Sequence, residues 1–174
     1  MSDEHVMLTD ELRARVGQTR AYTAPEPLGA AAIRYFAQAV GDLNPLYLDR
    51  AFAQAHGHRD VVAPPTLLAE TNQYVVGEPD ADGYLGHSWH FDVPDSRLVR
   101  GGNAYEFHAY AHPDTVVTAT WRIAGIAERR TGAGVPMLVV DSEAEFTDAD
   151  GRLLLRNAES LVFTSLRPGR KGVV

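Results

Sequence analysis

The sequence predicts an α+β domain in which helices come first and a run of antiparallel strands follows. In the first part of the chain, apolar residues such as Ile33, Phe36 and Val40 recur at helical spacing. From Leu98 onward, apolar residues alternate with polar ones, which is the period of a half-buried strand. The links between these expected strands are short, and short links favour antiparallel neighbours.

Composition restricts the classes of function. The chain has 174 residues with 16 basic and 23 acidic ones, so we expect one domain that does not bind nucleic acid. It has no cysteine, which excludes disulfides, thiolate metal sites and a cysteine nucleophile. Its single lysine, Lys171, lies near the end of the chain, which argues against a Schiff base. No apolar run reaches the ~18 residues of a membrane span, and no signal-peptide core is present. We therefore expect a soluble, cytoplasmic protein.

Helix caps and breakers place the first elements. Thr9 is a suitable N-cap and Gly17 a suitable stop for a short helix, and Asp49 can cap another helix that ends near Gly57. Residues 1–18 are expected to be an N-terminal extension of the domain, and residues 167–174 a flexible tail. The expected elements are a helix at 10–16, a strand at 18–23, a helix at 28–40 and a helix at 50–56.

The stretch from Tyr35 to Asp49 contains a helix end followed by a rigid turn. Gly41 suits the left-handed position after a helix, and Pro45 prevents the helix from continuing. Asp42 and Asn44 are therefore held on a fixed turn, as reacting groups must be. The structural alternative is that both residues only cap the turn through their own backbone.

A further helix is expected to start at Ala63-Pro64-Pro65-Thr66, because proline suits the first turn of a helix. Its apolar stripe runs to Val76, so this helix should be buried and covers roughly Pro65 to Val76. The helix N-terminus offers free N–H groups and positive partial charge, which can stabilise an oxyanion.

The histidines of the chain give weaker signals. His56 and His58 lie near Asp60, but their spacing matches no common zinc motif, so we expect no metal. His87 and His90 fall in the loop-rich segment 77–97, where position alone fixes no geometry.

Four strands are expected after this loop, beginning at Leu98, Val117, Leu138 and Leu153. The breaks between them are His112-Pro113-Asp114, Gly132-Ala133-Gly134 and the strong hairpin signal Asp150-Gly151. Trp121 is expected on an outer face that needs cover from a second chain. With the strand near residue 20, the sheet has about five strands around one buried helix, which is the hot-dog fold.

A family resemblance supports this fold. Tyr35-Phe36, followed after four residues by Gly41-Asp42-Leu43-Asn44-Pro45-Leu46, resembles the signature of MaoC-like (R)-specific enoyl-thioester hydratases and dehydratases. Gly101-Gly102-Asn103-Ala104-Tyr105-Glu106-Phe107 resembles a strand of the branch with a fatty-acid-synthase-like dehydratase N-terminal domain. The resemblance covers about residues 20–166.

The resemblance implies reversible addition of water to an enoyl thioester of coenzyme A or acyl carrier protein, with no further cofactor. It implies that Asp42, Asn44 and Tyr47 form the catalytic set, and that Pro65, Thr66 and Leu67 lie against the substrate. Two departures matter. Tyr47 stands where the family has its catalytic histidine, and Pro65 falls where a glycine N–H usually meets the thioester carbonyl. Thr66 or Leu67 would then have to donate instead.

These departures leave three interpretations. The chain can be the substrate-shaping subunit of a heterodimer whose second hot-dog subunit supplies the histidine. It can be a self-sufficient homodimeric enzyme with Tyr47 as the acid. It can also be a non-catalytic acyl-thioester binding protein.

Overall fold

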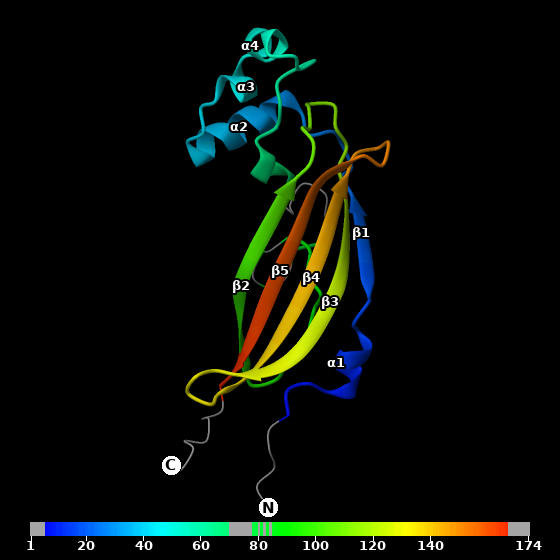
Figure 1. The fold of residues 1–174 in the computed structure, drawn as a ribbon, viewed down its shortest axis with the longest axis vertical. Helices are drawn as coiled ribbons and strands as arrows, with labels where there is room; N and C mark the ends of the chain where they lie inside the picture. The colour runs from blue at the N-terminus through cyan, green and yellow to red at the C-terminus, as the bar shows by residue number, and fades with distance from the viewer. Residues whose placement is uncertain (1–5, 70–77, 80, 82, 84, 167–174) are drawn as a thin grey trace, which may run out of the picture.

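The computed structural model describes residues 6–69, 78–79, 81, 83 and 85–166, and its main element is one antiparallel sheet (Figure 1). The sheet has five strands in the order β1-β3-β4-β5-β2. The strands are β1 (Thr19–Thr23), β2 (Ser96–Phe107), β3 (Thr118–Arg130), β4 (Pro136–Thr147) and β5 (Leu153–Ser165). The predicted α+β class and five-stranded antiparallel sheet are confirmed.

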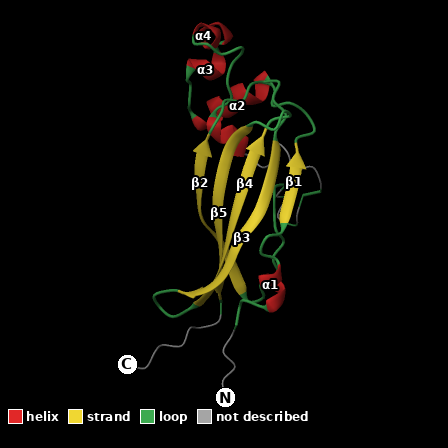
Figure 2. Cartoon of the chain, turned by 45° about the vertical axis from the view of Figure 1, so that its right-hand side comes forward, coloured by secondary structure: helices red, strands yellow, loops and turns green. Residues whose placement is uncertain are grey.

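The helices lie at the two ends of the sheet (Figure 2). The described helices are α1 (Asp10–Ala14), α2 (Ala30–Val40), α3 (Pro45–Leu48), α4 (Arg50–Ala55) and the 3₁₀ helix η1 (Pro65–Ala69). In both views α2, α3 and α4 gather at the end where β2 finishes, and α1 lies near the other end beside β1. Among the residues that the structure describes, no helix is long and apolar enough to cross a membrane.

The predicted caps and turns are present. Thr9 caps α1 by accepting from the Leu12 N–H, and Asp49 caps α4 by accepting from the Phe52 N–H. Gly41 ends α2 in the left-handed region, at φ +74°. The hairpin between β4 and β5 closes with the Asp148 N–H donating to the carbonyl of Arg152, as its Asp-Gly sequence predicts.

The helix predicted from Pro65 begins as a 3₁₀ helix rather than an α-helix, and η1 covers Pro65–Ala69. The Leu67 N–H closes its first turn by donating to the carbonyl of Pro64 at 2.9 Å. Residues 70–76 of the predicted helix lie outside the described residues, as does the predicted tail at 167–174.

The core lies on the inner face of the sheet. Every second residue of β4 is buried, and Leu138, Val140 and Phe146 are fully inaccessible. Met7, Leu8 and Leu12 of the N-terminal segment also belong to this core. Burial of these large apolar side chains supplies the main driving force for folding.

The prediction that Trp121 lies on an outer face was wrong. Trp121 is only 2% exposed and its ring stacks on that of His87, with ring centroids 4.4 Å apart. The predicted alternation in β3 is present, and its apolar row of Ala119, Trp121 and Ile123 is buried in the core. The face that does need cover belongs to β2, which is an edge strand and is exposed along almost its whole length.

Candidate active site

The turn after α2 is built by its own side chains. The Asn44 N–H donates to Asp42 Oδ1 at 3.2 Å, and the Leu46 N–H donates to Asn44 Oδ1 at 3.0 Å. Pro45 then opens α3 in the first helical turn, where its missing N–H costs nothing. Both side chains therefore serve the backbone, as the structural alternative predicted. The exposed Asp42 carboxylate retains acceptor capacity for a water or a substrate.

Tyr47 is the buried member of this turn, at 9% exposure. Burial above all, and then the nearby Asp42 carboxylate and Tyr110, raise the pKa of Tyr47 above its ordinary value. The phenol is therefore protonated at neutral pH and can donate a hydrogen bond, whereas it is a poor general base.

A short buried segment joins this turn to the start of η1. The Val62 N–H donates to the carbonyl of Leu46 at 3.0 Å, and the Ala63 N–H donates to that of Ala111 at 2.9 Å. Val62, whose N–H is bonded to the residue before Tyr47, is therefore only three residues from Pro65, where η1 begins. This linkage is what the predicted site needs, although convergence of all six predicted side chains on one substrate stays a prediction.

The start of η1 offers few donors for an oxyanion. Pro65 has no N–H, and the Leu67 N–H is already engaged with Pro64. Within the described part of the chain, the Thr66 N–H makes no hydrogen bond and Thr66 is exposed. Of the three predicted substrate-binding residues, Thr66 alone combines an N–H with an unoccupied hydrogen-bonding position.

Sequence reasoning missed a ring cluster beside this turn. Tyr110 lies edge-on to His58, with ring centroids 4.8 Å apart, and His58 lies edge-on to His112 at 6.1 Å. His112 Nδ1 is buried without a partner among the described residues. Burial, followed by the Arg59 guanidinium, lowers the pKa of His112, so the ring is neutral at physiological pH. No local signal could reveal this cluster, because it joins segments about fifty residues apart.

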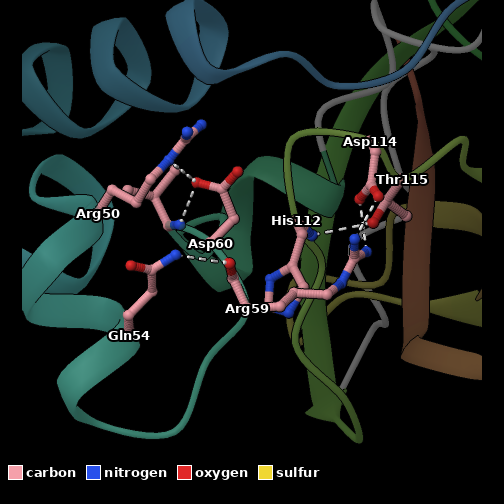
Figure 3. Close-up of polar contacts among 8 residues, drawn as sticks. Arg50, Gln54, Arg59, Asp60, His112, Asp114 and Thr115 are labelled. Atoms are coloured by element: carbon pink, nitrogen blue, oxygen red, sulfur yellow. Dashed lines mark hydrogen bonds and ion pairs between the residues drawn. The ribbon is translucent and has the colours of Figure 1, made fainter.

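Two arginine–aspartate pairs hold the surrounding loops (Figure 3). Arg59 forms a two-bond pair with Asp114, and that pairing lowers the pKa of the Asp114 carboxyl. Arg50 donates to Asp60 at 2.9 Å. Because the side chains of Arg59 and Asp114 are largely exposed, the pair positions the loops more than it stabilises the fold.

The histidines at 56, 87 and 90 lie away from the Asp42–Tyr47 turn. His87 is buried on the inner face of the sheet, where its Nδ1 lies 3.1 Å from the Tyr22 hydroxyl. Burial above all, then Arg20 and His90, lowers the pKa of His87 to about 3. His90 is exposed, and His56 stacks on Phe52 at the surface of α4. In the described ranges, no three histidine or acidic side chains are grouped to hold a metal ion.

Comparisons with known proteins agree with this architecture. A family model for the FAS1-like dehydratase domain region matches residues 14–156. A UPF0336 protein of Parafrankia sp. (strain EAN1pec) is 35% identical over 155 residues, which cover 87% of this chain and 94% of that protein. The chain belongs to the FAS1-like dehydratase family.

Solved structures share the hot-dog fold of this FAS1-like dehydratase-family chain. The ChsH1-ChsH2 complex from Mycobacterium tuberculosis matches with a TM-score of 0.65 at 20% identity, covering 87% of this chain and 90% of that one. The HadBC (3R-hydroxyacyl-ACP dehydratase) complex of the same organism matches with a TM-score of 0.58 at 21% identity, covering 83% and 95%. At these identities the likeness establishes the fold alone.

The capping role of Asn44 can be tested separately from any chemistry. Asn44→Ala should lower the free energy of unfolding by ~1 kcal/mol, because the Leu46 N–H loses its acceptor. Asn44→Asp should leave stability nearly unchanged, since aspartate caps as well as asparagine. Urea denaturation of both variants checks this, and equal stabilities for the two would contradict it.

His87 should make the protein sensitive to acid. The folded state keeps the ring neutral down to about pH 3, whereas the unfolded chain binds a proton near pH ~6.5. The free energy of unfolding is therefore unaffected by His87 above pH ~6.5 and declines as the pH falls below that value. At pH ~4 the loss from this one group is roughly 3 kcal/mol. His87→Phe keeps a ring against Trp121 but cannot titrate, so its stability should fall less steeply. Urea denaturation across this range, with His56→Phe at an exposed site as control, measures the difference, and parallel curves for wild type and His87→Phe would refute it.

Proposed function

We propose that this chain is a hydratase- or dehydratase-type protein acting on acyl thioesters of coenzyme A or acyl carrier protein. The observation that carries the proposal is the join between the Asp42–Tyr47 turn and the start of η1, through the Val62–Leu46 hydrogen bond. This join brings a carboxylate, a buried phenol and a helix start to one end of the sheet. Membership of the FAS1-like dehydratase family supports the same chemistry.

The residues suit some steps of the reaction better than others. Hydration needs a base for the water, an acid for the α-carbon and donors for the enolate oxygen. Asp42 can accept from the water, and protonated Tyr47 can donate to the water or to the thioester oxygen. Asn44 orients Asp42 through its backbone N–H. Thr66 offers one N–H to the developing enolate, but Tyr47 stands where the family has its second proton-transfer group, a histidine.

This gap favours a heteromeric enzyme in which the chain shapes the substrate channel and a second hot-dog subunit supplies a histidine. The edge strand β2 supports such pairing, since Val99, Tyr105 and Phe107 are all at least 40% exposed there. An unpaired, apolar strand edge invites another strand. The ChsH1-ChsH2 and HadBC neighbours are themselves complexes.

The edge can be tested by adding a charge. Phe107→Lys should weaken association with the partner subunit by about tenfold or more, because a buried unpaired ammonium opposes pairing. Val40→Lys, at an exposed site on α2, is the matched control and should not change association. Sedimentation velocity on the two-chain mixture gives the result, and unchanged association of Phe107→Lys would exclude β2 as the interface.

Turnover should depend on the partner. We expect the chain alone to hydrate crotonyl-CoA and longer enoyl-CoAs at least ~10²-fold more slowly than the complex with a subunit carrying Gly-Asp-x-Asn-Pro-x-His, because a general acid–base group typically contributes that much or more. Tyr47→His alone should restore little, since Pro65 still offers no donor.

The alternative of a self-sufficient homodimer gives the opposite outcome. Turnover by the purified chain alone at ~1–10³ per second, lost on Asp42→Ala or Tyr47→Phe, would make Tyr47 the acid of a complete site. Thioester binding without turnover in either sample would instead identify a non-catalytic binding protein.

A further inference from the structure

A cleft with both apolar and charged walls lies over the paired strands β2 and β5, on the inner face of the sheet beside residues 87–89 and away from the Asp42–Tyr47 turn. Its volume is about 220 Å³, and its walls are Leu98 and Arg100 of β2, Glu159 and Leu161 of β5 and residues 87–89. Strand pairing fixes this arrangement, because Arg100 lies opposite Leu161 and Leu98 lies opposite Phe163.

Glu159 is the unusual residue in this wall. It is only 8% exposed, and its ion-pair partner among the described residues is Arg100. The Arg100 Nη1 lies 3.5 Å from Glu159 Oε2, and the arginine side chain is mostly in solvent. Burial raises the pKa of this carboxyl, and Arg100 only partly offsets the effect. A buried carboxylate with one long contact has acceptor capacity left for a hydrogen-bond donor.

Two neighbouring groups on the same face share this condition. Asn157, two residues earlier on β5, has an Oδ1 that is buried without a partner in the described part of the chain. His87 Nε2, at the wall of the cleft, is likewise buried and unpartnered there. Asn157 is not part of the cleft lining, whereas Glu159 and His87 both are. Unsatisfied buried polar groups are costly, so these two at one cleft indicate an occupant that bonds there.

The charges around the cleft select the kind of occupant. An anion would face the Glu159 carboxylate, and a cation would face the Arg100 guanidinium. A neutral group that donates a hydrogen bond meets neither obstacle and satisfies Glu159. A hydroxyl group is the simplest such donor.

The inner face of β2 connects this cleft with the end of the sheet that carries the candidate active site. Phe107 and Tyr105 lie along it with stacked rings, their centroids 6.1 Å apart, and both are at least 40% exposed. Arg100 and Leu98 continue the same face into the cleft. From Phe107 to Arg100 the strand spans roughly 20 Å at ~3.3 Å per residue, a length that an extended acyl chain can follow.

We propose that the cleft around Glu159 binds a hydroxyl group on the distal part of the acyl chain, so that the preferred thioester is an oxygenated one. The inference rests on the proposed function, because it assumes that the thioester lies at the Asp42–Tyr47 turn. Glu159 accepts from the hydroxyl, and His87, which also lines the cleft, supplies a second contact.

Isothermal titration calorimetry on the full chain tests this with matched pairs of thioesters: decanoyl-, dodecanoyl- and hexadecanoyl-CoA against their ω-hydroxy counterparts. At the chain length that reaches the cleft, the ω-hydroxy thioester should bind about tenfold more tightly, which is the ordinary effect of one hydrogen bond to a charged group. Glu159→Met, which keeps an unbranched chain but removes the acceptor, should reduce this preference to below about threefold. Glu159→Gln, which retains one acceptor oxygen, should leave an intermediate preference.

Glu143→Met is the matched control, since Glu143 is an exposed residue of β4 that pairs with Arg122 on the opposite face of the sheet. It should keep the full preference. Equal affinity of both members of each pair for the wild-type chain would overturn the inference alone and identify the cleft as a water-filled one. Failure of every thioester to bind would overturn the proposed function of this chain, and the inference with it.

Discussion

The antiparallel pairing of β3, β4 and β5 is the constraint on which the rest of the structure depends. These three strands pair over nearly their whole length, which fixes which side chains share the inner face. Because side chains alternate along a strand, a slip of one residue would move every one of them to the other face. The buried row Trp121, Ala144 and Asn157, and the next row Ile123, Ser142 and Glu159, follow directly from this register.

Those rows explain why the segment before β2 folds back over the sheet. Trp89 inserts into the core and donates from Nε1 to Ser142 Oγ at 2.9 Å, which satisfies a serine that is 1% exposed. His87 stacks on Trp121 next to it. The same register places Glu159 directly opposite Ser142 on the neighbouring strand, where its printed partner is Arg100 rather than Trp89. Within the described residues, Trp89 thus satisfies Ser142, whereas Trp121 Nε1, His87 Nε2 and Asn157 Oδ1 remain buried without a hydrogen-bond partner.

The sequence predicted the elements better than their faces. Caps and turns are local, so Thr9, Gly41, Asp49 and the Asp150-Gly151 hairpin could be placed from residue type alone. The face of Trp121 depends on which side of the sheet the rest of the chain covers, and no local pattern in β3 contains that information. Tyr110 and His58 meet for the same reason only in three dimensions, through the pairing of β2 with β5 and the Ala63–Ala111 hydrogen bond.

The candidate active site shows how a local rule and a chemical role can use the same residues. Asn44 and Asp42 hold the turn because their side-chain oxygens accept from backbone N–H groups. The bond to Asp42 Oδ1 fixes the carboxylate, and its second oxygen keeps acceptor capacity. Tyr47 lies on the buried side of the same turn. Its raised pKa keeps the phenol protonated, and so able to donate a hydrogen bond, at neutral pH. A carboxylate that accepts and a phenol that donates can hold a water molecule between them. Moving its proton to carbon requires a further proton-transfer group. Among the described residues, the rings of His58 and His112 lie beside the turn through Tyr110. Because burial and Arg59 lower the pKa of His112 and disfavour its protonated form, this ring is a weak proton acceptor and carries no proton to supply as an imidazolium. A second subunit would therefore have to provide the proton-transfer group.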